Sequence, residues 1–445
     1  MTEALDRSPF AWIQHLLVDL CRSYGGSIQT GPFGSQLHAE DYRAEGTPII
    51  TVEHLQEGKI SHRNLPLVGQ RDYERLIRYS LAEGDLVFSR VGSIDRCALV
   101  TKAEHGWLFS GRCLRVRPGK GIVNSAFLAY ALNSWPKRRW ILNHSVGSTM
   151  LCLNTSIISA VPIELPPASE QFRIAEILST FDETLEQTEA LIAKYEQIRV
   201  GLMHDLFTRG LTPDGRLRPT AAQAPHLYKE SPLGWIPREW KATSVGDCLT
   251  GIDAGKSPDC PDTPASGTQW GVLKVGAIDP EGLRENENKV VLDKRLHNSA
   301  FLVRRDDLLL SRANTFDLVG LVCHVDGDPH NLMLSDKTLR LASNSSKTTT
   351  RFLYWSLRTA SSRRQIQNVA TGTSGSMKNI TQAGVRGICL TLPDVPEQLR
   401  ITHRLDAVVE TIGALKADCT KFRRTKYGLM QDLLTGRVLT KAVEA

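Results

Sequence analysis

Two long stretches of the chain repeat apolar residues at intervals of three and four positions. In the first stretch the apolar positions are 174, 178, 181, 185, 192, 195, 202 and 206, and in the second they are 401, 405, 408, 412, 415, 422, 429 and 433. This spacing places the apolar side chains along one side of an α-helix. No proline interrupts residues 170–209 or 397–437, and Glu170 and Glu397 occupy the first turn, where the helix dipole favours an anion. We therefore predict two helices of about 40 residues, each ~60 Å long at ~1.5 Å per residue.

The two helical stretches are copies of each other. An offset of 227 residues aligns positions 166–210 with 393–437 without a gap, and 16 of the 45 aligned positions are identical. Such self-similarity is the sequence signature of an internal repeat. Fainter matches join residues 8–13 to 231–236 and residues 84–90 to 306–312. The chain is thus predicted to be a tandem duplication, in which each half has a globular block followed by a long helix.

A helix of this length cannot bury its apolar side alone, and the simplest partner is the other copy, in a coiled coil. One helix carries acidic and the other basic side chains that suit such pairing: Glu183, Glu186, Glu189 and Glu196 in the first, and Lys416, Lys421, Arg423, Arg424 and Lys426 in the second. Exposed ion pairs contribute only ~0–1 kcal/mol each, so charge selects the partner while the apolar side supplies stability. The alternative is that each helix packs only on its own block.

Short β-like runs and two helical stretches fill the blocks at 20–165 and 240–392. The runs lie at 48–52, 85–89, 97–100, 271–275, 307–310 and 318–325, and helices are expected near 124–143 and 349–369. Glycine, proline, asparagine and aspartate punctuate the runs, as turns require. The fold class predicted is α+β, with two similar mixed α/β domains and two long helices. Residues 210–231 are rich in proline and are expected to link the halves.

Composition narrows the class of protein. The chain has 445 residues, of which 41% are hydrophobic, and its formal net charge is +6. The hydrophobic share excludes a disordered chain, and the absence of an apolar run of about 18 residues makes a membrane span unexpected. The nine cysteines are scattered and never form Cys-x-x-Cys, which favours reduced thiols in a cytoplasmic protein. The small positive charge suits a polyanion partner without identifying one.

Catalytic motifs are weak. Residues 251–257 resemble a phosphate-binding loop but are one residue short, and the prolines that follow forbid the helix that such a loop requires. Asp259, Glu287 and Lys289 have a loose nuclease-like spacing, for which a solvated loop is the favoured interpretation. No metal ligand set, cofactor site or nucleophile motif stands out. We expect no catalysis and no bound cofactor or metal in this chain.

Polar loops rich in glycine, serine and basic residues favour binding instead. Small residues let the backbone approach a phosphate, arginine can bind a guanine edge through two hydrogen bonds, and asparagine or glutamine can do the same for adenine. The alternative for each loop is an ordinary turn. The candidates for DNA contact are Ser35, Gln36, Arg90, Ser93, Ser148 and Thr149 in the first block, and Arg312, Asn314, Ser374, Ser376 and Lys378 in the second.

The repeated motifs resemble the specificity subunits of type I restriction–modification systems over nearly the whole chain. The resemblance rests on Leu-Pro followed by Glu-Gln-x-Arg-Ile at the start of each long helix, on Gly-Leu-Met-x-Asp-Leu near its end, and on Pro-Leu-Gly-Trp-Ile-Pro at 232–237. One departure is Thr208-Arg209-Gly210 in the first copy, where the second has Thr435-Gly436-Arg437. The resemblance implies two target-recognition domains held apart by two long conserved helices that form a coiled coil, with a pseudo-twofold relation from the internal repeat.

The resemblance also implies a division of the chain and a set of partners. The division is 1–165 for target-recognition domain 1, 166–210 for the first spacer helix, 211–234 for a linker, 235–392 for target-recognition domain 2, 393–437 for the second spacer helix and 438–445 for a C-terminal tail. Each domain would bind one half of a split site in double-stranded DNA. Two modification (methyltransferase) subunits, carrying S-adenosylmethionine, and restriction (ATP-dependent translocase and nuclease) subunits would then methylate adenine or cleave.

Residues of the conserved helix motifs are the candidates for spacer or subunit contacts. They are Gln171, Arg173, Gly201, Leu202 and Met203 in the first helix, and Gln398, Arg400, Gly428, Leu429 and Met430 in the second. Two alternatives stay open. One is a metal-dependent nuclease centred on Asp259, and the other is a coiled-coil scaffold whose blocks bind protein.

Overall fold

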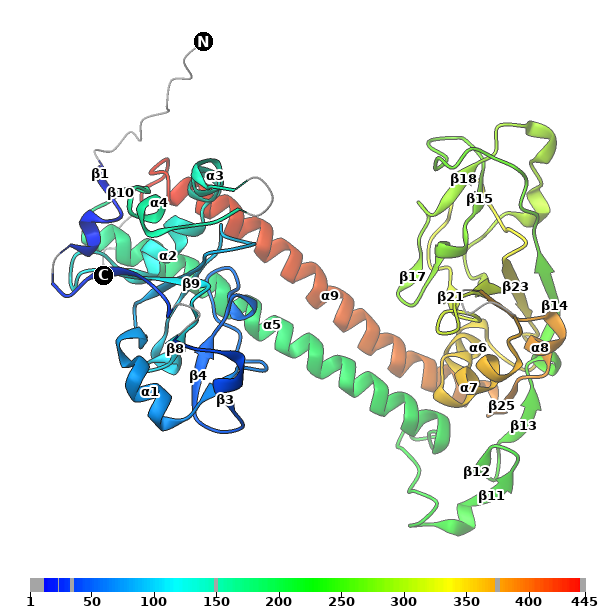
Figure 1. The fold of residues 1–445 in the computed structure, drawn as a ribbon. Coiled ribbons are helices and arrows are strands. Elements are labelled where there is room, and N and C mark those ends of the chain that lie inside the picture. The colour runs from blue at the N-terminus through cyan, green and yellow to red at the C-terminus, as the bar shows by residue number, and fades with distance from the viewer. Residues whose placement is uncertain (1–11, 23, 33–35, 148–150, 373–376, 441–445) are drawn as a thin grey trace. The chain divides into compact units, whose positions relative to one another are not determined.

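A computed structural model describes residues 12–22, 24–32, 36–147, 151–372 and 377–440 (Figure 1). The chain divides into two compact units. The first unit comprises residues 1–190 and 416–445, and the second unit comprises residues 191–415. Each long helix therefore contributes one end to each unit.

The first unit contains ten strands and four short helices within its described residues, besides its share of the long helices. The strands are β1 Ile13–Leu16, β2 Ser27–Thr30, β3 Tyr42–Arg43, β4 Thr47–Ile50, β5 Leu67–Val68, β6 Leu86–Ser89, β7 Cys97–Leu99, β8 Leu108–Phe109, β9 Cys113–Arg117 and β10 Pro162–Leu165. The short helices are α1 Gln70–Leu76, α2 Ser125–Asn133, α3 Trp135–His144 and α4 Thr155–Ser159.

The second unit repeats this plan with additional short strands. Its strands are β11 Tyr228–Ser231, β12 Gly234–Pro237, β13 Lys241–Ser244, β14 Leu249–Ala254, β15 Gly271–Leu273, β16 Ile278–Asp279, β17 Gly282–Leu283, β18 Asn288–Val290, β19 Leu308–Ser311, β20 Ala313–Asn314, β21 Val322–His324, β22 Leu332–Met333, β23 Thr338–Ser343, β24 Lys378–Asn379 and β25 Cys389–Leu392. Its short helices are α6 Thr350–Leu357, α7 Ala360–Val369 and α8 Gln382–Arg386. The long helices are α5 Ala168–Thr208 and α9 Val395–Leu433.

The same four-stranded antiparallel sheet forms the centre of both units. Its strand order is β2-β9-β6-β7 in the first unit and β14-β23-β19-β21 in the second. A parallel pair accompanies each sheet, β4 with β8 and β15 with β22, and an antiparallel pair precedes each long helix, β1 with β10 and β13 with β25. The duplication predicted from the sequence is therefore present in the topology of each unit.

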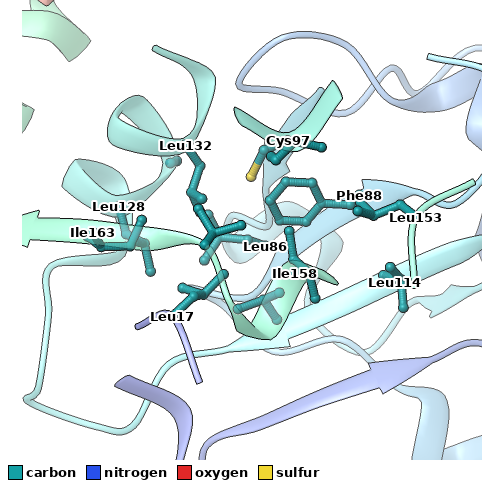
Figure 2. Packing of buried hydrophobic residues seen from close by; sticks show 14 of the residues in the cluster. Leu17, Leu86, Phe88, Cys97, Leu114, Leu128, Leu132, Leu153, Ile158 and Ile163 are labelled. Atoms are coloured by element: carbon teal, nitrogen blue, oxygen red, sulfur yellow. The ribbon is translucent and has the colours of Figure 1, made fainter. Parts of the chain in front are cut away.

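Successive residues of a strand point to opposite faces of its sheet. In each central sheet, the side chains on both faces are buried. In the first unit Leu86 and Phe88 pack with Leu128 and Leu132 of α2, as Figure 2 shows, while Val87 packs toward the β4–β8 side. In the second unit Leu308 and Leu310 face the helices, while Leu309 faces the β15–β22 side. One face of each central sheet is thus covered by helices and the other by the sheet that contains the parallel pair.

Several local predictions need correction. The helices expected at 124–143 and 349–369 are each two helices, α2 with α3 and α6 with α7, because Ser134 and Thr359 are extended (ψ 149° and 151°) and start a new helix. Pro136 in the first turn of α3 suits that restart, since proline is tolerated only at the beginning of a helix. The strand expected at 318–325 is limited to β21, because the backbone N–H groups of Leu318 and Val319 bond to the carbonyl of Thr315 in a turn.

The segment 211–234, predicted as a linker, is packed rather than loose. Leu211 and Tyr228 are buried, and the Tyr228 hydroxyl donates to the Pro219 carbonyl over 2.5 Å. The hairpin β11–β12 begins within this segment and ends at Pro237. Apolar groups at only a few positions are sufficient to fix the segment, a point that composition alone does not reveal.

The two long helices meet within each unit. In the first unit, Ile174 and Leu178 of α5 share a buried cluster with Met430 and Leu433 of α9. In the second unit, Leu206 of α5 shares a buried cluster with Ile401 and Leu405 of α9, together with Trp240, Phe352 and Trp355 of the globular part. Each helix end therefore packs on its unit's globular part and on the other helix, so neither of the two sequence alternatives is sufficient alone.

The predicted charge complementarity of the helices is present in part. Arg423 pairs with Glu189 over 2.5 Å, as expected, and Lys426 pairs with Asp182 over 2.6 Å, a carboxylate that the sequence analysis did not select. Glu186 pairs instead with Lys59 of the globular part, over 2.8 Å. The acidic side chains of α5 thus pair partly with α9 and partly with the globular part that precedes α5.

Candidate nucleic-acid interface

An arginine follows the central strand of each sheet and joins three loops at that end of the sheet. Arg90 follows β6; its N–H donates to the Arg112 carbonyl over 2.8 Å, and its carbonyl accepts from the Leu153 N–H over 2.8 Å. The loop that ends at Leu153 is closed by bonds between the backbones of Val146 and Cys152. In the first unit the structure thus brings the residues around 90 and 111 together with Leu153, which follows the bonded pair Val146 and Cys152.

The second unit repeats this arrangement bond for bond. Arg312 follows β19; its N–H donates to the Lys337 carbonyl over 2.8 Å, and its carbonyl accepts from the Ile380 N–H over 2.9 Å. The bonds between the backbones of Thr371 and Asn379 close the third loop. Residues 311–314 are therefore neighbours of Thr371, Asn379 and Ile380 in the structure.

Each of these arginines is partly buried and anchored on a turn. The Arg90 guanidinium donates to the Gly111 carbonyl over 3.1 Å, and the Arg312 guanidinium donates to the Asp336 carbonyl over 3.4 Å. An anchored arginine loses less side-chain freedom when it binds a ligand than a freely moving one does. The geometry suits planar recognition of a phosphate or a guanine edge.

The other candidates in the second unit lie beside Arg312. Asn314 of β20 pairs with Lys378 of β24, and the Asn314 side chain bonds to the Ser311 hydroxyl over 3.4 Å and to the Thr315 N–H over 2.9 Å. The Lys378 ammonium donates to the Gly372 carbonyl over 2.8 Å. Asn314 and Lys378 are only partly buried, so both side chains are accessible at the surface beside Arg312.

The candidates in the first unit are more dispersed. Ser93 is exposed three residues beyond Arg90. The Gln36 side chain accepts from the Tyr79 hydroxyl over 2.8 Å, and its carbonyl accepts from Arg75 over 2.6 Å, so Gln36 contributes to the internal structure of the unit. Five candidates lie outside the described residues: Ser35, Ser148, Thr149, Ser374 and Ser376.

Sequence reasoning missed two basic residues of this surface, Arg112 and Lys337. Arg112 is exposed and Lys337 partly exposed, and each lies in the turn that holds the arginine after the central strand. A further match between the two halves could have revealed them. Residues 110–115 align with 335–340 at an offset of 225, which differs from the offset of the long helices. Insertions between the repeats change the offset and hide such matches.

A hollow of about 660 Å³ adjoins the turn of the first unit. Its lining includes the side chains of Thr51, Glu53, His54 and Asn64, and residues 110–112. These groups offer both hydrogen-bond donors and acceptors, which a base edge requires. The first unit therefore presents a polar recess beside its candidate arginine.

Other basic residues that are repeated between the two halves are internal. Arg115 and Arg340 occupy equivalent strand positions; Arg115 donates to Gln29 over 2.6 Å, and Arg340 donates to Asp253 over 2.9 Å. Burial lowers the pKa of Arg115 to about 10. Arg138 pairs with Asp95 over 2.5 Å, and Arg363 donates to the Val319 carbonyl over 2.9 Å. These four side chains are committed to the folded unit and are excluded from the candidate interface.

The repeated residues at the helix starts also act inside each unit. The Gln171 side chain accepts from the N–H of Asn124, the N-cap of α2, over 2.9 Å, and the Gln398 side chain accepts from the N–H of Thr349, the N-cap of α6, over 3.0 Å. Both glutamines are buried. Arg173 donates to the Thr440 carbonyl over 3.5 Å. Among the candidates for spacer or subunit contacts, Gln171 and Gln398 thus fix each helix to its globular part, whereas Arg173 contacts the segment that follows α9.

The helix ends, by contrast, border two equivalent grooves. One groove, of about 580 Å³, lies in the second unit between the end of α5 and the α6–α7 junction. The other, of about 300 Å³, lies in the first unit between the end of α9 and the α2–α3 junction. The helix positions that line both are related by the offset of 227: Val200 and Tyr427, Met203 and Met430, His204 and Gln431, and Thr208 and Thr435.

An exposed tryptophan borders each groove. Trp235 is 53% exposed and Trp135 is 56% exposed, and Val200 and Tyr427 are similarly exposed. A Cβ at Gly201 or Gly428 would meet no atom of the described residues within 4 Å, so no close backbone approach in that part of the chain explains either glycine. Exposed apolar side chains gathered in a recess are typical of protein-binding surfaces.

Within the described residues, no three His, Cys, Asp or Glu side chains are grouped so that they could hold a metal ion. In the same part of the chain, no helix combines the length and the apolar character that a membrane crossing requires.

Comparison with known proteins shows what the chain is similar to. Residues 32–197 match the family model described as the type I restriction modification DNA specificity domain. The resemblance inferred from the repeated motifs, to the specificity subunits of type I restriction–modification systems, is thereby confirmed. The matched proteins are named as specificity subunits, which recognise DNA, rather than as catalytic subunits.

Particular relatives extend the similarity over most of the chain. A Methanocaldococcus jannaschii protein, provisionally named the MjaX specificity subunit of a type I restriction enzyme, is 26% identical over 89% of this chain and 88% of its own length. The StySPI specificity subunit of Salmonella potsdam is 25% identical over 87% of this chain and 80% of its own. The crystal structure of a type I restriction–modification S subunit from M. genitalium has the same fold, with a TM-score of 0.59 and 14% identity, over 97% of this chain and 98% of that chain.

Proposed function

We propose that this specificity subunit recognises a bipartite DNA target, with one half-site bound by each globular part. The observation that carries the proposal is the duplicated arrangement of Arg90 and Arg312, each anchored on a turn at the same end of the same sheet. A duplicated DNA-binding surface has two copies of the same contact to offer, and divergent loops allow each copy to prefer its own sequence. The proposed domains are residues 1–165 and 235–392.

The long helices, 166–210 and 393–437, act in this proposal as a two-helix coiled-coil spacer with pseudo-twofold symmetry. The buried clusters that contain Leu178 with Leu433 and Leu206 with Leu405 support pairing near each end. A stiff spacer keeps the gap between half-sites constant, since a displacement of several ångströms removes base contacts. Insertion of one turn in both helices, about four residues or ~6 Å, should therefore change the gap between the half-sites.

The two equivalent grooves support the proposed partners. Two copies of one modification (methyltransferase) subunit need two equivalent surfaces, and the repeat supplies equivalent helix positions at Val200 and Tyr427. Each lies in a groove with an exposed tryptophan, Trp235 or Trp135, although the repeat does not relate these two tryptophans. The modification subunits would carry S-adenosylmethionine and methylate adenine, and restriction subunits would join for cleavage. The cytoplasm, where the genomic DNA lies, is the proposed location.

The proposed function is tested by assembly with modification subunits and mapping of methylated adenines in DNA. The expected result is a single motif of two short half-sites separated by a fixed gap, absent when this chain is omitted. Binding should weaken steeply with added salt, because each phosphate contact releases counterions. Cleavage of DNA by the purified chain with magnesium, abolished by Asp259→Ala, would favour a nuclease instead. Binding of protein but never of DNA would favour a scaffold.

A further inference from the structure

The turn before the last strand of the central sheet differs in chemistry between the two units. Residues 110–112 precede β9 and residues 335–337 precede β23, and both turns hold the backbone of the anchored arginine over 2.8 Å. The backbone role is therefore the same in both units. The side chains differ, because the middle position is Gly111 in the first unit and Asp336 in the second.

Asp336 is held in place yet accessible. One carboxylate oxygen accepts from the Ser257 hydroxyl, and the other lies 3.1 Å from the Lys337 ammonium. The Asp336 side chain is 41% exposed. A carboxylate oxygen has two lone pairs, so a single partner on each oxygen leaves room for another donor.

The surroundings of Asp336 are basic. Lys337 is its neighbour, Arg312 donates to its carbonyl, and Lys378 lies on the strand next to β20. Burial opposes the ionised form, but the Ser257 hydroxyl and the Lys337 ammonium lower the pKa of Asp336 below its ordinary value. The group is thus ionised at neutral pH and can only accept hydrogen bonds.

A carboxylate on a DNA-binding surface suits one kind of contact with DNA. Phosphates repel it, so it contributes nothing to backbone contacts, whereas the exocyclic amino group of cytosine or adenine in the major groove donates to it. Guanine and thymine present acceptor oxygens at the corresponding edge, which leave a carboxylate without a proton to bind.

We propose that Asp336 is a specificity-determining residue of the second domain, which accepts a hydrogen bond from the amino group of a cytosine or adenine in that domain's half-site. The proposal rests on the proposed function and adds a residue and a base class to it. Ser257 and Lys337 are positioning residues for the carboxylate. The first domain has Gly111 and a polar recess at this place, so its half-site depends on other side chains.

The test compares the full chain with its Asp336→Asn variant, each assembled with modification subunits, by mapping methylated adenines on a DNA library. The amide of asparagine donates as well as accepts, so discrimination at one base pair of one half-site should fall roughly 5- to 150-fold. The other half-site and the gap should not change. The matched control is Asp328→Asn, because Asp328 pairs with Arg305 over 2.8 Å beyond β21, near the strand end opposite Arg312, and this variant should keep the original motif.

Two outcomes would overturn the inference while leaving the proposed function intact. An unchanged motif in the Asp336→Asn variant is one, and a uniform loss of methylation with every base preference retained is the other, since the latter indicates a merely structural role. Absence of a bipartite motif with the unaltered chain would instead overturn the proposed function, and this inference with it.

Discussion

Glu170 and Glu397 occupy the same position in two copies of one helix, yet their surroundings differ. Glu170 accepts from the backbone and hydroxyl of Thr440, over 2.8 and 2.6 Å. Glu397 accepts from the Leu211 N–H over 2.7 Å, from Arg218 over 2.5 and 3.1 Å, and from the Trp240 indole over 3.1 Å. In both units the carboxylate holds the segment that follows the end of the other long helix. The duplication has kept the role and changed the partners.

The turns at the candidate interface also keep one role in both units, but there the exposed side chains differ. Inside each unit, the glutamines at positions 171 and 398 keep the same bonds to a helix cap. At the surface, Gly111 and Asp336 share a backbone role and differ in side chain. A scaffold fixed by buried polar bonds thus permits the exposed positions to vary, which is what a protein with changing DNA targets requires.

The largest expected effect is a difference in the free energy of unfolding between variants of Glu397 and Glu170. Glu397→Ala removes the buried carboxylate partner of Arg218 and leaves it only the exposed Glu239, at 3.7 Å, so it should lower the free energy of unfolding by ~3–5 kcal/mol. Glu170→Ala removes hydrogen bonds but strands no buried charge, so ~1–3 kcal/mol is expected. Equilibrium unfolding in urea measures both values. Equal losses would show that the Arg218 ion pair does not distinguish the two sites.

The anchored arginines should separate the two half-sites. Arg90→Ala should weaken binding of the first half-site and Arg312→Ala that of the second, each by ~1–3 kcal/mol if the guanidinium contacts a base. Competition binding with DNA altered in one half-site at a time measures the effect. Weakening that is uniform over all sequences would assign these arginines to phosphates, and weakening of the same half-site by both would contradict the comparison.

Buried thiols should make both units sensitive to alkali. Burial raises the pKa of Cys21 in the first unit and of Cys323 in the second from an ordinary value near 9 to about 12. The unfolded thiol ionises first, so this stabilisation is complete below about pH 9 and is lost as the pH rises toward 12, by ~1.4 kcal/mol per pH unit for each thiol. Cys21→Val and Cys323→Val should each reduce the slope of stability against pH between 9 and 11. An unaltered slope would contradict the assignment.

The smallest effect is expected on the exposed side of the helices. Arg423 and Glu189 form an exposed ion pair, and Arg423→Ala should cost at most ~1 kcal/mol, less in high salt. Leu405→Ala is the contrasting control, since this buried side chain should cost ~2–5 kcal/mol. Thermal unfolding at low and high salt distinguishes them, and a larger loss for Arg423→Ala would reverse the roles assigned to charge and apolar contact.

The sequence predicted the elements whose pattern is long or repeated. The spacing from Ile174 to Leu206 was sufficient for α5, because many apolar positions agree on one period. It was insufficient for the α2–α3 break at Ser134 or the turn at Thr315, where a few backbone dihedrals decide. Arg90 and Arg312 were selected from a match between the two halves, whereas Arg112 and Lys337 were missed, because insertions change the offset of the match that contains them.

The central claim is that each globular part recognises one half of a divided target. Exchange of residues 20–165 for those of a relative, followed by single-molecule sequencing of methylated adenines, tests it most directly. The account predicts that the first half-site changes to that of the relative, while the second half-site and the gap are retained. An unchanged motif, or the alteration of both half-sites together, would contradict it.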